Sequence, residues 1–89
     1  MITKPFLRNL ATKGHLLKPV ILIGNKGLTE NVSEEIEGAL IAHELIKIQI
    51  SAGTRDDRKV MVKKILDDHK ATLVQEIGHR LVIFRASEE

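Results

Sequence analysis

The sequence predicts a small α/β domain with the element order α-β-α-β-α-β-β and a mixed four-stranded sheet. Apolar residues recur at helical spacing in three segments and at strand spacing in four. A strand, a helix and a second strand over residues 20–50 form one unit in which the two strands run parallel. Gly78-His79, between the last two strands, is a two-residue hairpin signal, which makes that pair antiparallel. The 89 residues are expected to form one domain with one core, over residues 1–89.

Three helices are expected from apolar stripes and from the residues at their ends. The first runs from Lys4 to about Lys13, with Thr3 as N-cap and Gly14 at its end. The second follows the N-cap Thr29 and reaches about residue 43, and the third spans roughly residues 55–69. The expected buried stripes of the second and third helices are Val32, Ile36, Ala39 and Leu40, and Met61, Val62, Ile65 and Leu66.

The strands differ in how much of each face should be buried. Residues 20–23 are all apolar, so this strand is expected to be covered on both sides. Residues 45–50 alternate, with isoleucines facing inward and with Lys47 and Gln49 facing outward. Residues 72–77 and 80–85 form the terminal hairpin, and we interpret Phe84 in its second strand as a core residue.

Composition excludes several classes of protein. No apolar run reaches the length of a membrane span and no secretory signal is visible, so no membrane partner is expected. The absence of cysteine fits a reducing compartment, and we expect a cytoplasmic protein. Phe6 and Phe84 are the only aromatic residues, which excludes a surface that stacks several bases on aromatic rings.

Charge is segregated along the chain although the net charge is only +2. Residues 1–27 carry five basic residues and no acid, residues 28–44 carry five glutamates and no base, and residues 45–64 carry six basic residues against two acids. Such segregation favours a bipolar surface, whose basic face binds polyanions. The alternative is a set of solvated helix faces that bind no partner.

The loop Gly24-Asn25-Lys26-Gly27 lies between the end of a predicted strand and the start of a predicted helix. Backbone N–H groups in such a loop can point together toward an anion, and Lys26 adds a mobile positive charge. The loop therefore suits a phosphate or a nucleic-acid backbone. The alternative interpretation is a tight turn that simply needs two glycines.

No enzyme, cofactor or metal site is expected. The four histidines, His15, His43, His69 and His79, are scattered, and no pair has metal-ligand spacing. Glu34 and Glu37 on an exposed acidic helix face are more consistent with solvation than with acid–base chemistry. The chain also lacks the full phosphate-loop motif of nucleotide hydrolases.

Four ordered motifs resemble the CRM domain in its stand-alone bacterial YhbY-type form. The first is the stretch over residues 18–32, which contains the glycine loop. The others are Ala39-Leu40 with residues 43–47, then Arg55-Asp56-Asp57-Arg58, then residues 74–79 with Phe84-Arg85. The resemblance is clearest over residues 10–85.

This resemblance implies an RNA-binding α/β domain, similar in fold to the C-terminal domain of translation initiation factor three. It also implies association with precursors of the large ribosomal subunit, RNA contact through the glycine loop and a neighbouring basic surface, and neither DNA nor a cofactor as ligand. We expect a monomer. The predicted RNA-binding residues are Gly24, Asn25, Lys26, Gly27, Arg8, Lys13, Arg55, Arg58 and Lys59.

A protein-interaction module remains the alternative function. In this case the acidic second helix, with Glu30, Glu34 and Glu37, would dock a basic partner, and RNA binding would be incidental.

Overall fold

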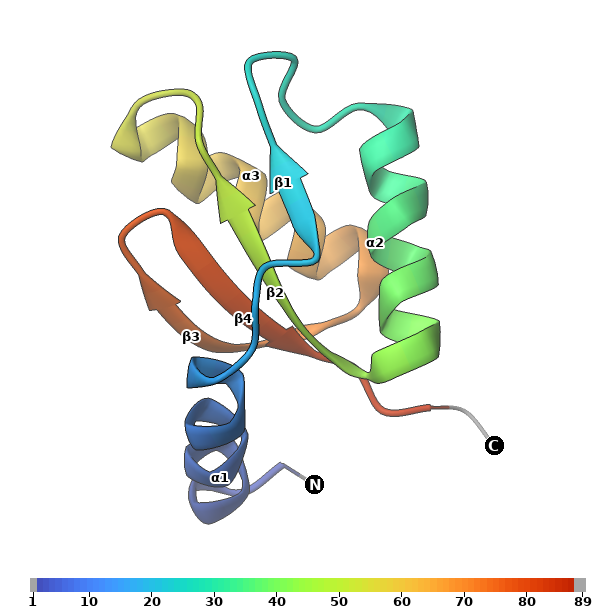
Figure 1. Ribbon diagram of the computed structural model, residues 1–89, viewed down its shortest axis with the longest axis vertical. Coiled ribbons are helices and arrows are strands. Elements are labelled where there is room, and N and C mark those ends of the chain that lie inside the picture. Colours follow the sequence, from blue (N-terminus) through green and yellow to red (C-terminus); the bar gives the residue numbers. More distant parts are fainter. Residues whose placement is uncertain (1, 88–89) are drawn as a thin grey trace.

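The seven predicted elements are present in the expected order in the computed structural model, which describes residues 2–87 (Figure 1). They are α1 (Lys4–His15), β1 (Ile21–Ile23), α2 (Glu30–His43), β2 (Leu45–Ile50), α3 (Arg55–His69), β3 (Thr72–Ile77) and β4 (Arg80–Phe84). The strands form one sheet in the order β1-β2-β4-β3, in which β1 and β2 are parallel and the other neighbours are antiparallel. The predicted α/β fold with a mixed four-stranded sheet is therefore confirmed.

Each helix begins directly after a threonine in extended conformation, as the sequence predicts for the first two. The hydroxyl oxygens of Thr3, Thr29 and Thr54 each accept a hydrogen bond from the backbone N–H three residues later, at 3.3, 3.2 and 3.1 Å. Such caps satisfy donors that the first helical turn leaves open. At α3 the cap is reciprocal, because the Thr54 N–H donates to the Asp57 carboxylate at 2.9 Å.

The main core lies between one face of the sheet and the helices α2 and α3. Alternate residues of β2 and β4 point into it, as expected for a strand with one face against a helical layer. The predicted stripe of α2 packs here, with Ile36 and Leu40 fully buried and Val32 and Ala39 partly so. The buried members of this core are Ile21, Ile23, Ile36, Leu40, Ile46, Ile48, Ile50, Val62, Ile65, Leu81 and Ile83.

The opposite face of the sheet is covered by α1, but only in part. The helix continues one residue beyond Gly14, which does not end it as predicted but is buried against β4. Lys47 was expected to face solvent, yet it is only 6% exposed. Its Nζ donates to the carbonyl of His15, at 3.3 Å, and so lies at the negative end of the α1 dipole.

Phe84 also lies on the α1 face and not in the main core. Its ring packs edge-on against the ring of Phe6, with centroids 5.5 Å apart and an interplanar angle of 77°. Its neighbour Ile83 is the one that points into the main core. The predicted core position of Phe84 is corrected accordingly, because alternation along β4 places the two residues on opposite faces.

The strand β1 is covered on one side alone, which contradicts the expectation of two buried faces. Ile21 and Ile23 are buried in the main core, whereas Leu22 is 66% exposed and Val20 is 54% exposed. In Figure 1, β1 forms an edge of the sheet and α1 lies at the other end of the molecule's long axis. The apolar run of residues 20–23 therefore does not reflect a doubly buried strand.

Candidate nucleic-acid interface

Three connections meet at one end of the sheet. They are the glycine loop at residues 24–27, the segment at residues 51–54 before α3, and the β3–β4 hairpin (Figure 1). The Ser51 N–H donates to the carbonyl of Ile23 at 2.9 Å, and the Ile50 N–H donates to the carbonyl of His79 at 2.8 Å. These bonds hold the three connections side by side, and we call this region the loop edge.

The glycine loop forms a tight turn closed by a hydrogen bond from the Gly27 N–H to the carbonyl of Gly24, at 2.9 Å. Gly27 has φ of +70°, a left-handed conformation in which a side chain is strained. The Gly27 N–H is not free for a ligand, because it donates to the Gly24 carbonyl within the loop. The N–H groups of Asn25, Lys26 and Leu28 have no hydrogen-bond partner among residues 2–87 and remain available to an anion.

The start of α2 adds two further donors to the loop edge. Thr29 caps the N–H of Val32 with its hydroxyl and that of Ser33 with its carbonyl. The N–H groups of Glu30 and Asn31, in the first turn, are left open at the positive end of the helix dipole. The exposed carboxylate of Glu30 also lies in this turn, so the local field is only partly positive.

The basic side chains of α3 begin at the same edge. Arg55 and Lys59 are exposed, and neither makes a hydrogen bond or an ion pair with residues 2–87. Arg58 is half-buried, and its Nη1 donates to the carbonyl of Gly53 at 3.2 Å, which ties the helix to the segment before it. All three line one hollow between α3 and the hairpin, together with Glu76 and Gly78.

The same helical turn also carries the acidic residues Asp56 and Asp57, and the charge of Asp57 has a structural use. The Thr54 backbone N–H, and then its hydroxyl, lower the pKa of Asp57 by hydrogen bonding to the charged carboxylate. The capping box therefore holds this negative charge at the start of α3.

The structure brings together six of the nine predicted RNA-binding residues at the loop edge and leaves a seventh, Arg58, half-buried beside them. Arg8 and Lys13 are exposed on α1, at the other end of the molecule (Figure 1). They are not part of the loop edge and form a separate basic area on a molecule 34 Å long.

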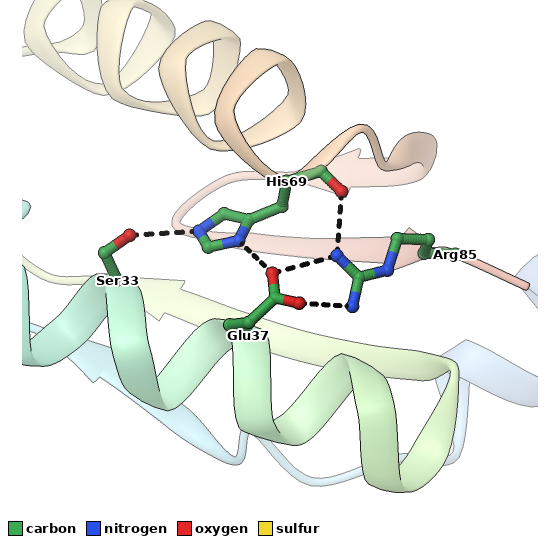
Figure 2. A network of polar contacts seen from close by, with 4 residues as sticks. All are labelled: Ser33, Glu37, His69 and Arg85. Atoms are coloured by element: carbon green, nitrogen blue, oxygen red, sulfur yellow. Dashed lines mark hydrogen bonds and ion pairs between the residues drawn. The ribbon is translucent and has the colours of Figure 1, made fainter. Parts of the chain in front are cut away.

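The acidic face of α2 differs from the expectation, because Glu37 is not simply solvated (Figure 2). Arg85 donates to its two carboxylate oxygens at 2.9 and 2.8 Å, and His69 Nδ1 lies 2.9 Å from one of them. The bonds from Arg85 first, and then the bond with His69, lower the pKa of Glu37 from 4.5 to about 2. Glu30 and Glu34 are exposed. Glu37 is paired, so it does not add a third free negative charge to this face of α2.

His69 holds this network together. It is only 6% exposed, and its Nε2 lies 3.2 Å from the Ser33 hydroxyl while its carbonyl accepts from Arg85 at 3.0 Å. The network links α2, the end of α3 and the residue after β4 (Figure 2). Within residues 2–87, no three His, Asp or Glu side chains are grouped to hold a metal ion, and no helix is long and apolar enough to span a bilayer.

Sequence reasoning missed Arg80 and Gln49, which lie on the sheet beside the loop edge. Arg80 is exposed, and its Nε donates to Gln49 Oε1 at 3.3 Å across the β2–β4 pair. The observation that brings these two residues together is the strand register of β2 with β4, which pairs Gln49 with Arg80. This register belongs to two strands that α3 and β3 separate in the sequence, so it cannot be read from either residue alone.

Comparisons with known proteins agree with this architecture. The model of the CRS1 / YhbY (CRM) domain matches residues 2–85. A Haemophilus influenzae protein named "RNA-binding protein" is 46% identical over 86 residues. The match covers 97% of this chain and 84% of the length of that protein. The Bacillus subtilis protein named "Probable RNA-binding protein YqeI" is 32% identical over 89 residues. This match covers all of this chain and 93% of the length of that protein.

A solved structure shares the fold as well. The solution structure of SAV1595 from Staphylococcus aureus, described as a candidate RNA-binding protein, superposes with a TM-score of 0.84 at 34% identity. The match covers all of this chain and 93% of the other. With the family model over nearly the whole length, these similarities establish that the chain belongs to the CRS1/YhbY (CRM) domain family.

Proposed function

We propose that this protein is an RNA-binding, non-enzymatic module that uses the loop edge to hold the RNA backbone. The observation that carries the proposal is the meeting of open backbone N–H groups with the unpaired side chains of Lys26, Arg55 and Lys59 at one end of the sheet. Backbone amides and mobile cations together are the usual ligands of phosphate groups. The names of the relatives support the same ligand.

The RNA would be held mainly by its phosphates. Neither phenylalanine lies at the loop edge, because Phe6 of α1 and Phe84 of β4 pack against each other on the α1 side of the sheet. Binding should therefore be dominated by counterion release. Arg58 would contribute through the nitrogens that its bond to Gly53 leaves open, while Arg8 and Lys13 would contact only an RNA that extends along the molecule.

The cellular RNA in this proposal is ribosomal RNA in a precursor of the large subunit, bound in the cytoplasm by a monomer. This part depends on the resemblance to the stand-alone bacterial members of the family. A rigid domain with a basic edge could hold an RNA fold in an immature particle and leave when mature contacts bury that fold.

Sedimentation of cell extracts tests the proposal. The wild-type protein should migrate with large-subunit precursors at low salt and be released as salt is raised. The double variant Lys26→Gln/Lys59→Gln should be lost from these fractions. The matched control Lys18→Gln/Lys70→Gln removes two exposed lysines away from the loop edge and should stay bound. Migration only with the small subunit, or with no ribosomal particle at low salt, would contradict the ribosomal assignment.

The alternative, a basic partner on the acidic helix α2, loses support from the geometry. Glu37 is engaged by Arg85 and His69, and Glu30 lies in the first turn of the helix beside the loop edge. Charge reversal at Glu30 and Glu34 should leave association with RNA intact, whereas neutralising Lys26 and Arg55 should weaken it. The opposite pattern would favour the protein-interaction function.

A further inference from the structure

One row of residues crosses all four strands beside the loop edge, on the part of the α1 face of the sheet that α1 leaves open. The strand register pairs Leu22 with Gln49, Gln49 with Arg80, and Arg80 with Ile77. All four side chains point to the same face, since directly paired residues in a sheet share a face. The row is about 14 Å wide, from three strand spacings.

The row has a fixed polar centre and two apolar ends. Gln49 donates to the Ser51 hydroxyl at 3.1 Å and accepts from Arg80 Nε at 3.3 Å. These bonds orient the Arg80 guanidinium on the sheet and leave its two terminal nitrogens without a protein partner among residues 2–87. At the ends, Leu22 and Ile77 are 66% and 60% exposed.

The surface around the row is hollowed and not filled by α1. Arg80 and Ile77 line one hollow toward the hairpin, with Ser51 and His79, and a second hollow toward the last residue of α1, His15. In Figure 1 no helix lies in front of β1 and β2 at the end of the sheet near the loops. The next row on this face, which contains Lys47 and Val82, is buried by α1.

A planar cation between exposed aliphatic side chains suits the face of a nucleic-acid base. Unpaired bases stack on arginine guanidinium planes as well as on aromatic rings, and aliphatic side chains add apolar contact. Leu22 precedes Gly24 by two residues of strand, about 7 Å. An RNA whose phosphates lie on the glycine loop would therefore bring an adjacent nucleotide over this row.

We propose that the row Leu22–Gln49–Arg80–Ile77 docks the base of an unpaired nucleotide, next to the backbone held at the loop edge. The inference depends on the proposed function, because the loop edge positions the RNA. It adds that the bound RNA carries a bulge or a loop at the point of contact, and is not a continuous duplex.

Three RNA duplexes of the same length test this: one uninterrupted, one with a single bulged nucleotide, and one whose bulged nucleotide lacks its base. The last two carry the same phosphates, so their difference reports the base alone. The wild type should bind the bulged duplex about fivefold more tightly than the abasic one, the lower range for one stacked base.

Arg80→Lys keeps the charge but removes the planar group, so the ratio of the two affinities should fall to about one while abasic binding is unchanged. Leu22→Ser should also lower the ratio. The control Val60→Ser, at an apolar residue of α3 that is 68% exposed, should not change it.

A wild-type ratio of one, with all three duplexes bound, would overturn the base site and leave the proposed function standing. A ratio unchanged by both Arg80→Lys and Leu22→Ser would place the base elsewhere and overturn it too. Binding of no RNA would overturn both proposals.

Discussion

Gly14 of α1 lies directly against Val82 of β4: a β-carbon on Gly14 would stand 2.6 Å from Val82 Cγ1. The absence of a side chain lets the helix approach the sheet closely, and thereby buries Lys47 beside it. Gly14 is thus a packing residue, although its position near the helix end suggested a C-cap.

Gly14→Ala should destabilise the protein by about 1–3 kcal/mol, because the added methyl group overpacks the contact with Val82. The matched control is Gly38→Ala, in the exposed part of α2, where a β-carbon would meet nothing within 4 Å. Alanine is the better helix former, so Gly38→Ala should stabilise by about 0.5–1 kcal/mol. Urea unfolding measures both changes. A Gly14→Ala variant that is at least as stable as the wild type would contradict the packing described for α1.

Glu37→Gln should make the protein less stable at neutral pH, and this difference should disappear in acid. The folded-state pKa of Glu37, about 2, lies below its ordinary value of 4.5, so the ionised form stabilises the fold. This stabilisation is fully present above about pH 4.5 and is lost as the pH falls toward 2. Because 44% of the side chain is exposed, solvent screening limits it to the order of 1 kcal/mol.

Free energies of unfolding across this pH window test the expectation. The control Glu34→Gln removes an exposed carboxylate of the same helix that makes no hydrogen bond or ion pair with residues 2–87, and it should change stability little at neutral pH. A Glu37→Gln effect that is the same at pH 2 and pH 7 would show that the ion pair with Arg85 and His69 is not its cause.

The two loop glycines should respond differently to alanine. Gly27 has φ of +70°, so Gly27→Ala should cost about 1–2 kcal/mol of stability. Gly24 has no such conformation and open space around it, so Gly24→Ala should leave the melting temperature unchanged. Both should weaken RNA binding if the backbone approaches a phosphate here. Gly24→Ala with wild-type affinity would remove this glycine from the contact.

RNA affinity should fall steeply with salt, and the slope should report the number of phosphate contacts. Lys26→Gln should reduce the slope of log affinity against log salt by about one and leave stability unchanged. Lys18→Gln, an exposed lysine away from the loop edge, should leave the slope as it is. Affinity that does not depend on salt would contradict backbone binding.

The sequence predicted what depends on neighbours along the chain. The threonine caps at residues 3 and 29, the hairpin at Gly78-His79 and the parallel pairing of β1 with β2 all follow from local chemistry and connection length. The family motifs then identified the fold, and they predict that the RNA contact lies at the glycine loop.

What the sequence did not predict depends on where α1 docks and on contacts between distant residues. Lys47 is buried, and Leu22 is exposed, because α1 covers one part of that sheet face and leaves the other open. Glu37 meets Arg85 across 48 residues of sequence, a contact that no helical spacing reveals. Arg80 gains its place beside the loop edge only through strand register.

The most direct test of the central claim is NMR mapping of backbone amide shifts while a structured RNA is added to the labelled protein. The account predicts that the perturbed amides lie at residues 24–31, 51–59 and 78–80. Residues 34–43 of α2 should be unaffected, and residues 4–13 of α1 should shift only with an RNA long enough to span the molecule. Shifts confined to α1 or to the outer face of α2, with the loop edge unchanged, would contradict the claim that this edge binds RNA.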